Sequence, residues 1–131
     1  MTSAQKKILI VEDEPDTAEM FAEMMRMSGY EIFKAYNGSS AVALIGKEKP
    51  AAVVLDLMMP DLSGLDVLRL VRSDPEISAT PVIVVSAKSL PSDIKDGLEA
   101  GASVYLTKPV GYLDLKAAVE NAIRSAGKGS D

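Results

Sequence analysis

A chain of 131 residues has the length of one ordinary domain, which leaves no room within it for a second catalytic domain. Its 47% hydrophobic and 25% charged residues are typical of a globular domain, and a net charge of −5 disfavours nucleic acid and anionic membranes as partners. The sequence has no cysteine and no histidine, which excludes disulfides, thiol chemistry, His or Cys metal ligands and a phosphohistidine within the chain.

The sequence contains no segment typical of a secretory signal or a membrane-spanning helix. The apolar run Ile8–Val11 is too short for a signal sequence. The longest nearly apolar stretch, Ala51–Pro60, has about half the length that a spanning helix needs and contains Asp56. We therefore expect a cytoplasmic protein with one domain over residues 6–126 and flexible tails at residues 1–5 and 127–131.

Short apolar runs alternate with segments of helical periodicity along the chain. The first run, 8–11, predicts a strand buried on both faces, and Pro15 then begins a helix that Gly29 ends. A more alternating strand, closer to an edge of the sheet, is predicted over 31–36. The turn at Asn37–Gly38 leads into the second helix.

The same alternation continues in the second half of the chain. Strands are predicted over 51–55, 82–85 and 103–107, with a helix over 65–71 after the first of them. The helix predicted over 91–100 is expected to turn Ile94 and Leu98 inward. The last helix carries an apolar stripe with a period of 3.6 residues, formed by Leu115, Ala118, Val119, Ala122 and Ile123.

Five strands that are each followed by a helix predict parallel pairing, because parallel neighbours need a crossover connection. The sequence therefore predicts an α/β fold with a single doubly wound sheet and helices on both faces. Hydrophobic periodicity does not give the order of the strands. It does indicate that function lies beyond their carboxyl ends.

Polar side chains suited to catalysis stand at four of these carboxyl ends, namely Glu12 and Asp13, Asp56, Ser86 and Lys108. Any one of them is expected wherever a buried strand reaches solvent, but the full set predicts one site. Carboxylates brought together repel one another without a cation, and an oxygen-only cluster suits Mg²⁺. In such a site Lys108 would hold a phosphate, and Asp56 would be the nucleophile of a phosphoryl transfer.

Several motifs, in this order and at this spacing, resemble the receiver domain of two-component response regulators, of the chemotaxis-regulator type. They are Glu12–Pro15, Val53–Leu65, Pro81–Ala87, and Gly101–Ala102 followed by Tyr105–Pro109. The resemblance extends from Lys6 to about Arg124. It implies a flavodoxin-like (βα)5 fold with strand order 2-1-3-4-5.

The resemblance also implies how phosphate is handled. Asp56 would be the phosphoacceptor, with Lys108 and Ser86 as its catalytic partners. Lys108 and the backbone of Ala87 would contact the phosphate. Ser86 and Tyr105 would form the switch, and the Lys108–Pro109 peptide would be cis. Such a domain is not a classical enzyme, but it catalyses its own phosphorylation and dephosphorylation.

A metal site is implied by the same resemblance. Asp13 would bind the metal directly and Glu12 through water, while Asp56 and the backbone carbonyl of Met58 would complete the protein ligands. The ion would be Mg²⁺, with Mn²⁺ as a substitute.

The implied partners are a histidine kinase or histidine phosphotransfer protein and a downstream effector or output domain. The signal would leave through the surface of the fourth helix, fifth strand and fifth helix, where a phosphorylation-dependent homodimer is a further implied assembly. Neither direct binding to nucleic acid nor binding to a membrane is expected. Val110 stands where many relatives with DNA-binding outputs carry Phe, which weakens an assignment to that subgroup.

Three other functions are open to a chain of this fold. A flavin-binding electron carrier needs a hydroxyl- and glycine-rich phosphate loop after the first strand, where this chain has the acidic segment 12–16. An aspartate-nucleophile phosphatase would place two acidic residues two apart at that point and would carry an inserted lid. A degenerate receiver that acts only as a docking module would lack part of the acidic, hydroxyl and lysine set.

Overall fold

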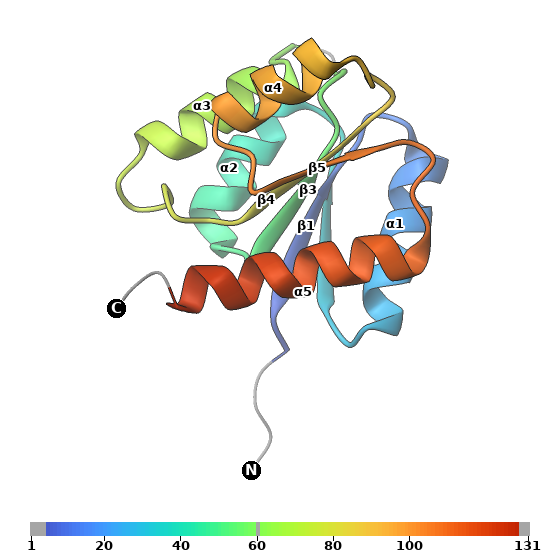
Figure 1. Ribbon diagram of the computed structural model, residues 1–131. Coiled ribbons are helices and arrows are strands. Elements are labelled where there is room, and N and C mark those ends of the chain that lie inside the picture. The colour runs from blue at the N-terminus through green and yellow to red at the C-terminus, as the bar shows by residue number, and fades with distance from the viewer. Residues whose placement is uncertain (1–4, 60, 129–131) are drawn as a thin grey trace.

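Five parallel strands form the centre of the computed structural model, which describes residues 5–59 and 61–128 (Figure 1). The strands lie in the order β2-β1-β3-β4-β5, which confirms the predicted doubly wound, flavodoxin-like sheet. Their bounds are β1 (Lys7–Val11), β2 (Glu31–Ala35), β3 (Ala52–Leu55), β4 (Val82–Ser86) and β5 (Val104–Thr107).

Five helices cover the two faces of this sheet. Figure 1 shows α1 and α5 on one face and α2, α3 and α4 on the other. Their bounds are α1 (Pro15–Met27), α2 (Gly38–Glu48), α3 (Gly64–Ser73), α4 (Pro91–Glu99) and α5 (Tyr112–Lys128). Across residues 5–59 and 61–128, the helices are too short or too polar to cross a membrane.

The strands β1, β3 and β4 are apolar on both faces because each face is covered by helices. Their alternate residues therefore enter two separate cores. Ile8, Ile83 and Val85 pack with α1 and α5, whereas Leu9, Leu55 and Val84 pack with α2 and α3. This rigid centre holds the ends of the strands in fixed positions.

The structure differs from the sequence prediction in α4. Leu98, predicted to point inward, is 46% exposed, and the buried residue of this helix is Gly97. The reason is that the ring of Tyr105, from β5, lies directly against Gly97 and occupies that position under the helix. Ile94 is half-buried, as expected of an inward residue.

The domain bounds of 6–126 and the flexible tails stay a prediction, and the structure describes only part of each end. α5 continues to Lys128, and Gln5 donates a hydrogen bond to the carbonyl of Gly29 (3.0 Å). The remaining parts of the predicted tails, 1–4 and 129–131, lie outside the described residues.

Candidate phosphoryl-transfer site

The ends of four strands meet at the carboxyl edge of the sheet and carry the predicted polar residues to one place. The backbone hydrogen bonds of the sheet continue past the strands: the amide of Glu12 donates to Ala35 O (3.0 Å) and the amide of Asp56 to Val11 O (3.0 Å). On the other side of the site, the amide of Lys108 donates to Ser86 O (2.9 Å). Regular parallel pairing thus positions the side chains.

A lysine joins two buried carboxylates at the centre of the site. Lys108 Nζ lies 2.9 Å from Glu12 Oε1 and 3.0 Å from Asp56 Oδ2. The side chains of Glu12 and Asp56 are 3% and 8% exposed, whereas that of Lys108 is 26% exposed. Charges so little exposed require this pairing, because desolvation of an unpaired carboxylate is costly.

The second oxygen of each carboxylate accepts a backbone hydrogen bond. The amide of Glu14 donates to Glu12 Oε2 (3.3 Å), and the amide of Met58 donates to Asp56 Oδ1 (3.0 Å). The start of α3 packs closely against the backbone of Asp56, since a Cβ on Gly64 would lie 2.5 Å from the carbonyl oxygen of Asp56. Both carboxylates are therefore held in defined orientations.

The electrostatics of the site follow from burial. Burial raises the pKa of Glu12 to about 7, against the lowering effect of its hydrogen bond to Lys108 and assisted by the charge of Asp56. For Lys108, partial burial lowers the pKa, but the hydrogen bonds to Glu12 and Asp56 outweigh it and the net shift is upward. Lys108 therefore stays charged, whereas Glu12 changes its protonation near neutral pH.

The acidic residues of the site fit a hard divalent cation. Oxygen atoms of Glu12, Asp13 and Asp56 lie within 4.8 Å of one another, and Asp13 is exposed to solvent. All three offer carboxylate oxygen, which Mg²⁺ prefers, and an ion that retains several waters suits a site open on one side. The participation of the Met58 carbonyl stays a prediction.

The backbone of Lys88 connects the two predicted switch residues. Its amide donates to Ser86 Oγ (3.1 Å), and its carbonyl accepts a hydrogen bond from the hydroxyl of Tyr105 (2.8 Å). Ser86 is fully buried, and Tyr105 is half-buried rather than turned into solvent. Sequence reasoning missed Lys88, because a contribution from the main chain leaves no signal in residue type.

Asp61 fixes the loop between β3 and α3, a role that was not predicted. Its carboxylate accepts hydrogen bonds from Gly38 N (3.1 Å) and Ser39 Oγ (2.9 Å) at the start of α2, and from Leu62 N. These hydrogen bonds, led by that of the Leu62 amide, lower the pKa of Asp61. The loop that carries Asp56 and Met58 is therefore tied to a neighbouring helix. Sequence reasoning missed this role, because Asp61 binds residues of α2 that lie more than twenty positions away in the chain, and local spacing carries no signal for such a contact.

The remaining predicted residues lie around the same site. Ala87 is exposed directly after β4, Met58 is 57% exposed at the rim, and the Lys108–Pro109 peptide is cis. The structure thus brings the predicted site residues to one edge of the sheet, except for Tyr105, which lies within β5 opposite Val84 and whose hydroxyl reaches the loop after β4.

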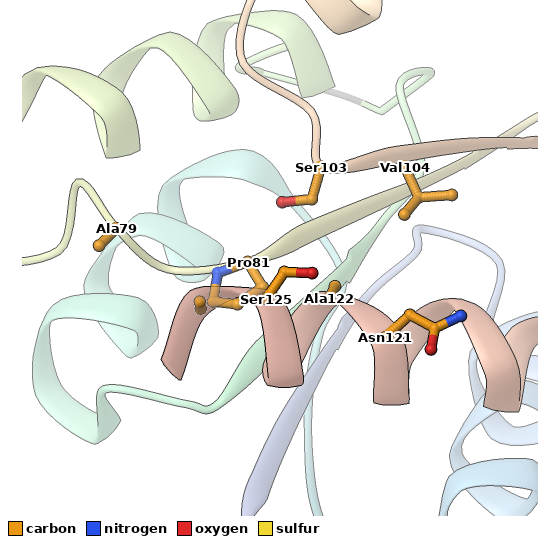
Figure 2. A pocket seen from close by; sticks show the side chains of 8 residues that line it. Ala79, Pro81, Ser103, Val104, Asn121, Ala122 and Ser125 are labelled. Carbon is orange, nitrogen blue, oxygen red and sulfur yellow. The ribbon is translucent and has the colours of Figure 1, made fainter. Parts of the chain in front are cut away.

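A pocket of about 310 Å³ lies at the opposite edge of the sheet, between α5 and the beginnings of β4 and β5 (Figure 2). Small and uncharged side chains line it, among them Ser103, Ala122 and Ser125. It offers no acid, base or nucleophile beyond hydroxyls, so the chemistry of this domain is expected at the acidic edge.

Known proteins with similar sequences or structures agree with this geometry. Residues 8–120 match the family model of the response regulator receiver domain. The chain is 42% identical to protein PilH of Pseudomonas aeruginosa, covering 79% of this chain and 86% of PilH. It is 36% identical to the DNA-binding response regulator MtrA of Mycolicibacterium smegmatis, covering 95% of this chain and 53% of MtrA.

A solved structure of another receiver domain contains a magnesium ion. The receiver domain of sensor histidine kinase PA1611 from Pseudomonas aeruginosa, described with a magnesium ion coordinated in its active-site cleft, matches with a TM-score of 0.86 and 29% identity. The match covers 92% of this chain and 99% of that one. By contrast, the chain spans about half the length of MtrA and of other transcriptional regulators that it matches.

Proposed function

Because the chain belongs to the response regulator receiver-domain family, we propose that it is a switch that accepts a phosphoryl group on Asp56 in the presence of Mg²⁺. The observation that carries this proposal is the environment of Asp56. Its carboxylate is almost buried, bound by Lys108 at 3.0 Å, and close to two further carboxylates. Phosphoryl transfer needs this combination of a positioned oxygen nucleophile and opposite charge for the phosphate.

The proposed transfer forms one bond and breaks one. A carboxylate oxygen of Asp56 attacks the phosphorus of a phosphohistidine or a small acyl phosphate, and the donor departs with the electron pair of the bond that breaks. Lys108 then contacts a phosphoryl oxygen, and the Ala87 amide and Ser86 hydroxyl donate to the others. When bound by Asp13, Glu12 and Asp56, Mg²⁺ supplies positive charge that lowers the repulsion between the carboxylates and the phosphate.

The route from Asp56 to the surface runs through the backbone of Lys88. A phosphoryl group on Asp56 adds strong acceptors for the Ser86 hydroxyl. When Ser86 turns toward the phosphate, the Lys88 amide loses its acceptor, and the Lys88 peptide that also binds Tyr105 is free to move. We expect the position of Tyr105 to change with it, which alters the surface of α4, β5 and α5.

The partners follow from this role. The phosphoryl donor would be a histidine kinase or a histidine phosphotransfer protein in the cytoplasm. The altered surface would act on a downstream effector, an output domain or a second copy of the chain. The named function of MtrA, DNA binding, belongs to a protein about twice as long, and this acidic domain is not proposed to contact DNA.

Phosphorylation by a small donor tests the proposal. With Mg²⁺ and acetyl phosphate, the intact mass of the protein should increase by one phosphoryl group, and an excess of a chelator should prevent the increase. An unchanged mass under conditions that keep the protein folded would favour a degenerate receiver that acts only by docking.

Mg²⁺ should also stabilise the folded protein. Replacement of Asp13 with Asn removes one negative charge from the acidic cluster, so the melting temperature without Mg²⁺ should rise. Millimolar Mg²⁺ should raise the melting temperature of the wild type by mass action but leave that of Asp13→Asn unchanged. Thermal melts with and without Mg²⁺ measure both effects, and a wild type indifferent to Mg²⁺ would count against the metal site.

Ser86→Ala should leave phosphorylation of Asp56 intact but weaken the change that it causes at the surface of α4, β5 and α5. Asp56, Lys108 and the acidic cluster remain, so the variant should still accept a phosphoryl group. Because the Lys88 amide has no Ser86 hydroxyl to lose, the NMR signals of α4 and Tyr105 should respond only weakly to phosphorylation. A response equal to that of the wild type would show that the signal takes another route.

A further inference from the structure

Gly97 is the point of closest approach between α4 and the ring of Tyr105. A Cβ atom at this position would lie 2.7 Å from Cδ2 and 2.8 Å from Cε2 of Tyr105. Such distances are well inside van der Waals contact, which for carbon atoms begins at about 3.5 Å. Gly97 is also the buried residue of α4. Glycine at this position therefore leaves the space that the ring occupies.

Hydrogen bonds hold both the Tyr105 ring and the C-terminal end of α4 in place, so moving either one would break them. The hydroxyl of Tyr105 is bound to the carbonyl of Lys88 at 2.8 Å, which fixes the far end of the ring. The C-terminal end of α4 is held by Arg72, whose Nε donates to Gly101 O at 2.9 Å. Arg72 is itself anchored, because its Nη1 donates to the carbonyls of Ser78 (3.0 Å) and Thr80 (2.6 Å). A side chain at position 97 would therefore displace Tyr105 or detach α4.

We propose that Gly97 is a positioning residue that leaves the space, here called the socket, in which the Tyr105 ring lies. We call the arrangement in this structure, with the ring against Gly97 and its hydroxyl on the Lys88 carbonyl, the inward position of Tyr105. The size of residue 97 sets the fraction of molecules in which Tyr105 adopts the inward position. The inference rests on the proposed function where it concerns signalling, because Tyr105 is the proposed switch residue. A larger residue at 97 shifts the population away from the inward Tyr105, and with it the arrangement of the α4, β5 and α5 surface.

The helix propensities of glycine and alanine allow this role to be distinguished from the general destabilising effect of a glycine inside a helix. Alanine is favoured over glycine inside a helix, so an unobstructed Gly→Ala change in α4 should raise the melting temperature. Gly46 provides the matched control: it lies inside α2, and a Cβ there would meet no atom within 4 Å. Gly46→Ala should therefore stabilise the protein, whereas Gly97→Ala should not.

The experiment measures the melting temperature of the wild type, Gly46→Ala, Gly97→Ala, Tyr105→Ala and the double variant Gly97→Ala/Tyr105→Ala. The NMR signals of the Tyr105 ring are compared in the wild type, Gly46→Ala and Gly97→Ala, which retain the ring. Gly46→Ala should raise the melting temperature by a few degrees, roughly as its propensity gain predicts, and leave the ring signals in place. Gly97→Ala should shift the ring signals and give no such rise. In the Tyr105→Ala background, where the ring is gone, Gly97→Ala should produce the rise seen at Gly46.

The inference is overturned if Gly97→Ala stabilises the protein as Gly46→Ala does and leaves the Tyr105 signals unmoved. It is also overturned if Gly97→Ala is equally unfavourable with and without the Tyr105 ring. Both measurements are made without phosphorylation. If acetyl phosphate fails to label the protein, the proposed function is refuted, but the melting temperatures still test the role of Gly97 separately.

Discussion

Replacement of Lys108 with Met should lower the free energy of unfolding by about 3 kcal/mol near pH 7.5, because it leaves two buried carboxylates without their cation. Removal of one partner from a buried ion pair typically costs about 3–5 kcal/mol. The lower end of that range applies here, since the lysine is partly exposed and water can reach it. Urea-induced unfolding of the two proteins measures the difference.

The loss of stability in Lys108→Met should be larger near pH 7.5 than near pH 5. The pKa of Glu12 in the folded protein is raised to about 7 from 4.5, so between these values the folded state holds a proton that the unfolded state releases. Stability from this group is therefore present below about pH 4.5 and is lost as the pH rises through 7. Without Lys108 the pKa of Glu12 should rise further, so that the variant recovers much of its stability near pH 5.

Two further variants make this prediction specific. Lys47→Met removes an exposed lysine from α2 and should have little effect at either pH. Adding Glu12→Gln to Lys108→Met removes one of the stranded charges and should restore stability near pH 7.5. Equal losses at both pH values, or a loss no larger than that of Lys47→Met, would show that the ion pair is not what holds the site together.

Asp56→Asn should abolish labelling by acetyl phosphate, which is the largest effect expected of any single change. An amide oxygen is a poor nucleophile, and the substituted residue cannot form the acyl phosphate. Asp61→Asn is the matched control because Asp61 lies in the same loop but its carboxylate binds the start of α2. The Asp61 variant should still be labelled. Labelling of Asp56→Asn to the level of the wild type would place the acceptor elsewhere.

The chain order of strands, helices and polar strand ends could be predicted from the sequence because each depends on local pattern. The run Val82–Val85 is β-branched throughout and forms the buried strand β4. Asp56 and Lys108 follow strands directly, so parallel pairing was enough to place both at the carboxyl edge of the sheet. Strand order itself required the family resemblance, since it depends on packing between elements far apart in the chain.

The features that could not be predicted depend on tertiary contact. The inward face of α4 was assigned to Ile94 and Leu98 from apolar spacing, but only Ile94 is partly buried. The ring of Tyr105 lies against Gly97, which is buried in place of Leu98. The link between Ser86 and Tyr105 uses the backbone amide and carbonyl of Lys88, which every residue type except proline would supply. Both features belong to the part of the site that we propose to move, where local pattern and global packing disagree.

The location of the phosphoryl group tests the central claim most directly. Borohydride reduces an aspartyl phosphate to homoserine, so a protein labelled with acetyl phosphate and Mg²⁺, then reduced and digested, carries a permanent mark at the acceptor. Peptide mass spectrometry should find homoserine at position 56 and unmodified aspartate at positions 13 and 61. Homoserine at Asp13 or Asp61 instead, or labelled protein in which Asp56 remains intact, would contradict the account.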